Sequence, residues 1–106
     1  MSGEATIFEV RDNKDQNRFE VDLGDSVAIA DYRLMTGKIM FTHTEVPKPH
    51  EGKGIATALV RAGLASARER GLKVIPTCPF FAAYIRKHAE EQDLLEPYYR
   101  KVLGLD

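Results

Sequence analysis

The stretch of sequence that decides the fold is Val46-Pro47-Lys48-Pro49-His50-Glu51-Gly52-Lys53-Gly54-Ile55-Ala56-Thr57. It follows a run typical of a β-strand, turns through two prolines and leads into an amphipathic helical pattern. A helix start leaves about four backbone N–H groups without partners, and Ser, Thr, Asp or Asn normally caps them. Here Gly52 and Gly54 stand at the entry, so a ligand can approach the backbone and the helix dipole favours a phosphate. Two interpretations stay open: an anion site, and a loop that merely turns.

Two other glycine-rich phosphate motifs do not fit this stretch. The Walker pattern G-x-x-x-x-G-K-[ST] is absent from the sequence. The dinucleotide pattern G-x-G-x-x-G fails at its third glycine, where Thr57 stands, and no acidic residue follows the next strand at the required spacing. P-loop and dinucleotide-binding proteins are therefore excluded.

The residues around the glycine stretch predict four strands before it and an alternation of helices and one strand after it. The expected strands are residues 6–11, 18–23, 27–35, 38–46 and 72–76, with a polar turn at 12–17; the expected helices are 54–70, 80–88 and a short piece from 97. The crossover through the first helix should be right-handed, which makes strands 38–46 and 72–76 parallel. The order β-β-β-β-α-β-α predicts an α+β fold, in which a mixed sheet combines an antiparallel meander with one βαβ crossover.

Composition sets the broad class of protein. The chain has 106 residues, 43% of them apolar and 29% charged, which predicts a single globular domain over residues 1–106. The formal net charge of −1 gives no basic field for nucleic acid, and one cysteine excludes a disulfide framework. The three scattered histidines do not suggest a metal site. No apolar run is long enough to span a membrane, and residues 1–4 lack signal-peptide features, so we expect a cytoplasmic protein.

A resemblance to a known family adds to these inferences. Residues 51–56, Glu-Gly-Lys-Gly-Ile-Ala, resemble the acetyl-CoA pyrophosphate loop of GNAT-superfamily N-acetyltransferases. Together with residues 41–47, 72–80 and 83–85, they resemble the small Yjdj-type branch of that superfamily, a minimal acetyltransferase-like domain. The matching pieces come in the expected order, between residues 41 and 85 of the chain.

The resemblance implies a GNAT-like fold and transfer of an acetyl group from acetyl-CoA to an amine. The strands 38–46 and 72–76 would splay apart to admit the pantetheine arm. The implied CoA-binding residues are Thr44, Glu45 and Val46 at the pantetheine, Glu51, Gly52, Lys53, Gly54, Ile55, Ala56 and Thr57 at the pyrophosphate, and Tyr84 near the thioester. Glu51 departs from the usual Gln or Arg, and because its charge repels a pyrophosphate it should point away or pair with Lys53 or His50.

Cys78 and His43 are the candidate catalytic residues. The resemblance places Cys78 near the thioester, where its thiol would accept the acetyl group or activate the amine; the alternative is a small buried apolar residue. His43 is expected to share a strand face with Ile39 and Phe41 and to act as a base, with Glu45 orienting it. The alternative for His43 is a half-buried side chain that a neighbour satisfies.

Two functions besides acetyl transfer stay open: an acyl-CoA-binding module without catalysis, and a protein-interaction domain. Direct attack by the amine and a two-step route through acetyl-Cys78 are both retained. The acceptor is not named by the sequence, because the helices that form the acceptor groove in larger acetyltransferases have no counterpart here. We expect an open site for an exposed lysine, a polyamine or a small amine, no nucleic-acid or membrane partner, and a monomer or weak dimer.

Overall fold

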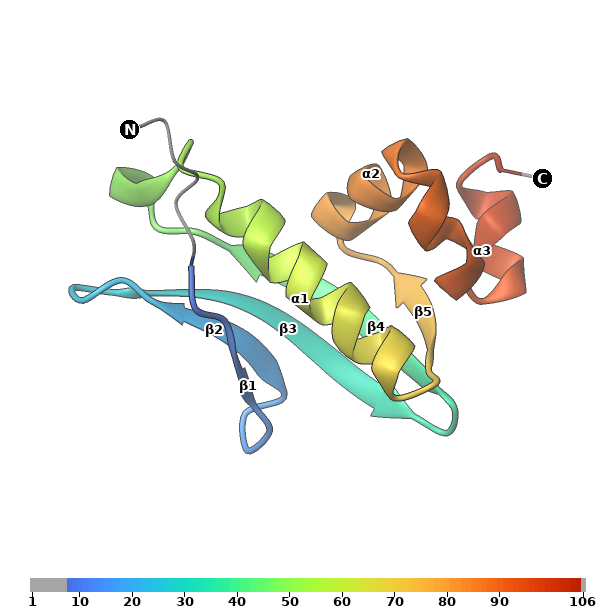
Figure 1. Cartoon of the computed structure of the whole chain (residues 1–106), viewed down its shortest axis with the longest axis horizontal. Coiled ribbons are helices and arrows are strands. Elements are labelled where there is room, and N and C mark those ends of the chain that lie inside the picture. Colours follow the sequence, from blue (N-terminus) through green and yellow to red (C-terminus); the bar gives the residue numbers. More distant parts are fainter. Residues whose placement is uncertain (1–7, 106) are drawn as a thin grey trace.

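A five-stranded mixed sheet, in the order β1-β2-β3-β4-β5, forms the centre of the computed structural model, which describes residues 8–105 (Figure 1). The strands are β1 Arg11–Asn13, β2 Arg18–Asp22, β3 Val27–Met35, β4 Lys38–Glu45 and β5 Lys73–Pro76. The helices are α1 Ile55–Glu69, α2 Pro79–Lys87 and α3 Pro97–Val102, with two short 3₁₀ helices, η1 Lys48–His50 and η2 Ala89–Leu94. Strands β1 to β4 pair antiparallel and β5 pairs parallel to β4. The predicted fold class and the β-β-β-β-α-β-α order are confirmed; η1 and η2 were not predicted.

The first strand differs from its prediction. Residues 8–10 have no regular structure, and β1 instead uses residues 11–13, of which Arg11 was expected to end the strand and Asp12 and Asn13 to begin the turn. Its polar side chains are held by neighbours: the Tyr32 hydroxyl donates to Asp12 Oδ1 at 2.6 Å, and burial together with this bond raises the pKa of Tyr32 to about 12. Polar contacts therefore hold β1 in place, whereas the prediction of a strand at residues 6–11 relied on the apolar side chains in that run. Residues 6 and 7 of the predicted strand lie outside the described residues.

Gly63 allows α1 to lie close to the sheet and to α2. A Cβ atom at this position would lie 2.9 Å from Phe41 Cε1 and 3.1 Å from Phe81 Cε2, closer than van der Waals contact permits. The rings of Phe41 and Phe81 stack with their centroids 3.9 Å apart. The stacked rings therefore connect β4 to α2 beside Gly63 of α1. This contact helps to position α2 relative to β4.

A β-bulge interrupts β4 opposite β3. Asp31 pairs with His43 and Tyr32 pairs with Phe41, so Thr42 has no partner across the ladder. One extra residue in a strand reverses the side-chain alternation beyond it. The bulge therefore changes which side chains of β4 face the helices.

The bulge corrects the predicted position of His43. Ile39 and Phe41 are buried before the bulge and Thr44 after it, whereas His43 and Glu45 are exposed. The expectation that His43 shares a face with Ile39 and Phe41 is wrong. The sequence alternation alone would have placed His43 among them, because it does not reveal the extra residue.

Strands β4 and β5 part after Phe41 and Pro76, their last paired residues. Pro76 has no N–H to continue the ladder, and the Phe41 carbonyl instead accepts hydrogen bonds from Cys78 N (2.9 Å) and Thr77 Oγ1 (3.0 Å). β4 continues to Glu45 while pairing only with β3. The expected divergence is thus present, and we call this gap the strand opening.

Candidate functional site

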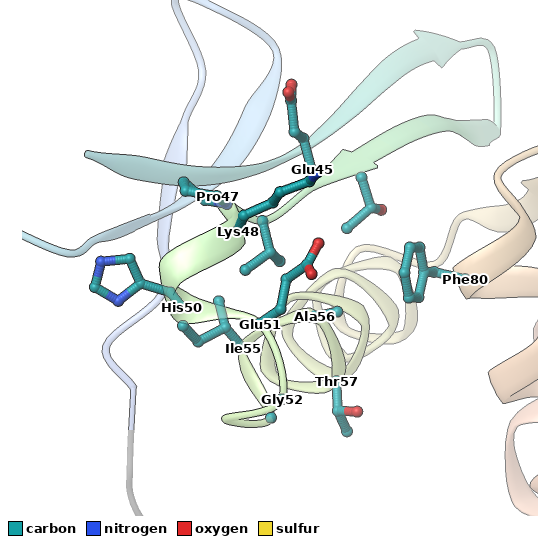
Figure 2. Close-up of a pocket in the computed structure, with 13 residues that line it drawn as sticks. Glu45, Pro47, Lys48, His50, Glu51, Gly52, Ile55, Ala56, Thr57 and Phe80 are labelled. Atoms are coloured by element: carbon teal, nitrogen blue, oxygen red, sulfur yellow. The ribbon is translucent and has the colours of Figure 1, made fainter.

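A cavity of about 620 Å³ lies between the end of β4 and the start of α1, and we call it the first cavity (Figure 2). Its lining residues are Thr44, Glu45, Val46, Pro47, Lys48, His50, Glu51, Gly52, Gly54, Ile55, Ala56, Thr57 and Phe80. The structure therefore brings together all of the predicted CoA-binding residues except Lys53 and Tyr84.

The start of α1 presents uncapped N–H groups. No side chain caps the helix at Gly54, and its first turn carries no acidic residue. Gly52 and Gly54 have φ of +83° and +87°, and no atom lies within 4 Å of where their side chains would be. Glycine tolerates this left-handed backbone, which strains other residues. The first turn of α1 is thus open to an anion approaching its N–H groups.

Lys53 does not line the first cavity, because it is held at the side of the loop. Its Nζ lies 3.3 Å from His50 Nδ1, and His50 Nε2 lies 3.1 Å from Asp25 Oδ1. An ammonium only donates, so Nδ1 accepts and Nε2 carries the proton that it donates to Asp25. Hydrogen bonds from Ser26 and His50 keep the pKa of Asp25 below its usual value. These contacts tie the β2–β3 turn to the glycine loop.

Two charged side chains of the first cavity differ from expectation. Glu51 was expected to point away or to pair with Lys53 or His50, but neither arrangement is present among the described residues. Figure 2 shows the Glu51 carboxylate extending over the start of α1 on the side facing Phe80. Lys48, which was not predicted to be a site residue, also lines the cavity and supplies a positive charge. The Lys-Pro-His segment directly before the glycines was the available signal.

Cys78 lies behind the wall of the first cavity. Its side chain is buried, with 1% of the residue exposed, and it occupies the N-cap position of α2. The Thr44 Oγ1 atom lies 3.2 Å from Cys78 Sγ. Thr44 lines the cavity and Cys78 does not, so the threonine separates the thiol from the cavity.

His43 and Glu45 form an exposed pair on the other side of the sheet. His43 Nε2 lies 3.5 Å from Glu45 Oε1, and the side chains are 58% and 69% exposed. The expected neighbourhood of the two residues is confirmed, while half-burial of His43 is not. Glu45 lines the first cavity and His43 does not, and in Figure 2 the Glu45 carboxylate points away from the start of α1.

A second hollow of about 350 Å³ lies between α1 and α2. It contains Tyr84, whose ring stacks on His88 at a centroid distance of 3.8 Å. Ala56, Thr57 and Phe80 line both the hollow and the first cavity. Phe80 is 54% exposed, because Phe81 and Ile85 occupy the buried positions of α2.

Neither a membrane-spanning helix nor a metal-ion site is present in residues 8–105. No helix in this part of the chain has the length and apolar character needed to cross a membrane. The same residues contain no group of three or more His, Cys, Asp or Glu side chains placed to hold a metal ion.

Comparison with known proteins matches residues 18–94 to the model of a family described as GCN5-related N-acetyl-transferase. Among solved structures, the chain is similar to the solution NMR structure of a GCN5-like protein from Staphylococcus aureus that carries a provisional assignment as an N-acetyltransferase. The two chains are 28% identical, with a TM-score of 0.66, and the match covers 84% of this chain and 88% of the other. No curated protein matches the chain. The chain belongs to the GCN5-related N-acetyltransferase family.

Proposed function

We propose that this protein transfers an acetyl group from acetyl-CoA to an amine. The observation that carries the proposal is the course of the first cavity, which runs from the uncapped start of α1 to Thr44, Glu45 and Val46, residues at the end of β4 and just after it that lie beyond the last β5 partner. A thioester of CoA needs both features: N–H groups for its pyrophosphate and an unpaired strand edge for its amide-containing arm.

The N–H groups at the start of α1 would bind the pyrophosphate. Backbone groups of residues 44–46, beyond the last β5 partner of β4, would bind the pantetheine arm. Thr44 would then lie near the thioester, where it closes the cavity towards Cys78. Lys48 would offset part of the phosphate charge, and Glu51 would oppose it.

Glu45 is our candidate for the group that removes a proton from the acceptor. An amine is protonated near neutral pH and must lose a proton before its nitrogen can attack. Glu45 is among the lining residues, but its carboxylate points away from the start of α1, so the acceptor would approach it from the side of the sheet on which His43 lies. His43 Nε2, 3.5 Å from Glu45 Oε1, would pass the proton to solvent. Bound acetyl-CoA supplies a thioester carbonyl, to which the acceptor nitrogen forms a bond while the bond to the CoA sulfur breaks. After the attack the nitrogen gives up its second proton and the departing sulfur takes one up, so the protonated amine and acetyl-CoA yield the acetylated amine, CoA and the proton that Glu45 removed.

The position of Cys78 supports direct transfer over a two-step route. A nucleophile must reach the carbonyl carbon, and Thr44 stands between the thiol and the first cavity. We therefore propose that Cys78 packs beneath the site and that the acetyl group moves straight to the amine.

The experiment is a transfer assay with acetyl-CoA and separate acceptors: a polyamine, a small primary amine and a peptide with an exposed lysine. Free CoA and acetylated product are quantified by chromatography. We expect product with at least one acceptor, and about a hundredfold slower turnover for Glu45→Gln, within the range that general bases contribute. Glu69→Gln, which removes a carboxylate from the far end of α1, is the control. CoA binding without product from any acceptor would instead support the binding-module alternative.

Three finer assignments belong to this proposal. We place the protein in the Yjdj-type branch of its family, in the cytoplasm, and as a monomer or weak dimer. The matching sequence pieces between residues 41 and 85 support the first assignment, and size-exclusion chromatography with light scattering tests the last.

A further inference from the structure

The second hollow is lined by positive charge and by no negative charge. Arg61 reaches it from α1 and Lys87 from α2. The other lining residues are Ala56, Thr57, Val60, Phe80, Ala83, Tyr84 and His88, so no Asp or Glu is among them. Two cations from different helices thus meet at one hollow in a chain whose formal net charge is −1.

These two cations have no ion-pair or hydrogen-bond partner among residues 8–105. Other basic residues of the same helices do have partners. Arg68 binds Asp93 at 2.8 Å and Glu91 at 3.2 Å, and Arg86 Nε donates to the Leu103 carbonyl at 3.4 Å. Arg61 and Lys87 are therefore the basic side chains of α1 and α2 that are available to an anion at this hollow.

The hollow continues the first cavity. Ala56, Thr57 and Phe80 line both, and Arg61 follows Ile55 by six helical positions, about 9 Å along the axis of α1. A ligand with one phosphate group at the helix start can therefore place a second phosphate beside Arg61. Phe80, which is 54% exposed between the two sites, offers an aromatic surface to whatever joins them.

We propose that Arg61 and Lys87 bind the 3′-phosphate of CoA and so distinguish CoA from 3′-dephospho-CoA. The two compounds differ only in that phosphomonoester, which carries nearly two negative charges at neutral pH. In CoA the ribose separates this phosphate from the pyrophosphate. One CoA molecule could therefore place its pyrophosphate in the first cavity and its 3′-phosphate in the second hollow. This inference rests on the proposed function, because it requires CoA in the first cavity.

The test measures dissociation constants of CoA and 3′-dephospho-CoA by isothermal titration calorimetry. The proteins are the wild type, Arg61→Gln, Lys87→Gln and the double variant. Arg33→Gln and Lys101→Gln are matched controls, since both side chains are exposed and lie outside the two sites. Thermal unfolding of each variant shows that it is folded.

We expect the wild type to bind CoA about tenfold more tightly than 3′-dephospho-CoA, an effect of the size that charge-assisted contacts give. The double variant should bind both ligands equally, with its affinity for 3′-dephospho-CoA unchanged, and the controls should behave as the wild type. The preference should shrink as salt is raised.

Four results would overturn the inference, and they can be told apart. Equal binding of the two ligands by the wild type, or a preference that survives in the double variant, overturns the role of Arg61 and Lys87 and leaves the proposed function standing. If the double variant loses affinity for both ligands equally, the substitutions affect the site in general. That result would also overturn the claim that Arg61 and Lys87 distinguish CoA from 3′-dephospho-CoA. No binding of either ligand by the wild type overturns the proposed function and this inference together.

Discussion

Thr44 Oγ1 lies 3.2 Å from Cys78 Sγ, so the side chain at the base of the first cavity hydrogen-bonds the cysteine that it screens. The β-bulge at Thr42 makes this contact possible, because it turns Thr44 inward and His43 outward. One irregularity in β4 therefore determines both what closes the cavity and which side chains remain on its rim.

Replacing Cys78 by Ala should leave catalysis almost intact. The thiol is 1% exposed and separated from the cavity, so we expect turnover to fall less than threefold and stability to fall by about 1 kcal/mol from lost packing. Intact-mass measurement of the wild type during turnover should detect no acetylated protein. An acetyl adduct that disappears in Cys78→Ala, together with a large loss of turnover, would establish the two-step route instead.

Gly54→Ala should weaken CoA binding at the helix start. Gly54 has φ of +87°, so a side chain there strains the backbone by about 1–2 kcal/mol and shifts the first turn of α1. We expect a similar loss of stability in denaturant and about tenfold weaker binding of CoA by calorimetry.

Gly71→Ala is the matched control for Gly54→Ala. Gly71 has φ of +67°, with open space around it, but it follows the far end of α1. It should lose comparable stability and keep its affinity for CoA. Equal loss of affinity in both variants would mean that the effect comes from general destabilisation and not from the anion site.

Glu51→Gln should bind CoA more tightly than the wild type. Glu51 lines the first cavity and its charge repels a pyrophosphate at the helix start. Because the side chain is exposed, water and salt screen this repulsion, and we expect a gain of only about threefold that fades as salt is raised. Glu69→Gln, with the same change of charge at the end of α1, should not gain. Weaker binding in Glu51→Gln would show that Glu51 contacts the ligand favourably.

The Glu20 carboxylate should stabilise the fold in a pH-dependent manner. It accepts hydrogen bonds from Arg18 Nε at 2.6 Å, Asn13 Nδ2 at 2.9 Å and Arg11 Nη2 at 3.1 Å, and those from Arg18 and Asn13 are the main reason that its pKa is lowered. A lowered folded-state pKa contributes stability above the unfolded value, about 4.3, and loses it as pH falls through the folded value.

Urea unfolding of Glu20→Gln across a pH series tests this contribution. At pH 7 the variant should be less stable by about 1–3 kcal/mol, because an uncharged amide oxygen in this buried position is a weaker acceptor for the three donors than the carboxylate is. The difference from the wild type should shrink as pH falls below about 4.3. A difference that is constant with pH would show that the charge of Glu20 contributes nothing.

The element order and the glycine loop could be predicted because each leaves a local pattern in the sequence. Alternation identifies Arg18–Asp22, three- and four-residue spacing identifies α1, and paired glycines indicate the open helix start. The bulge at Thr42 could not be predicted, since one unpaired residue has no signature of its own. The orientation of the Lys53 side chain could not be predicted either. It depends on a contact with His50, which in turn hydrogen-bonds Asp25, a residue distant in sequence.

The most direct test of the central claim is an NMR titration of the ¹⁵N-labelled protein with CoA, which observes each backbone N–H group. We expect the largest amide shifts on Gly52, Gly54, Ile55 and Ala56 at the start of α1, with a second set on residues 44–46. No shifts at saturating CoA, or shifts confined to β1 and β2 at the β1 edge of the sheet, would show that CoA does not bind at the start of α1.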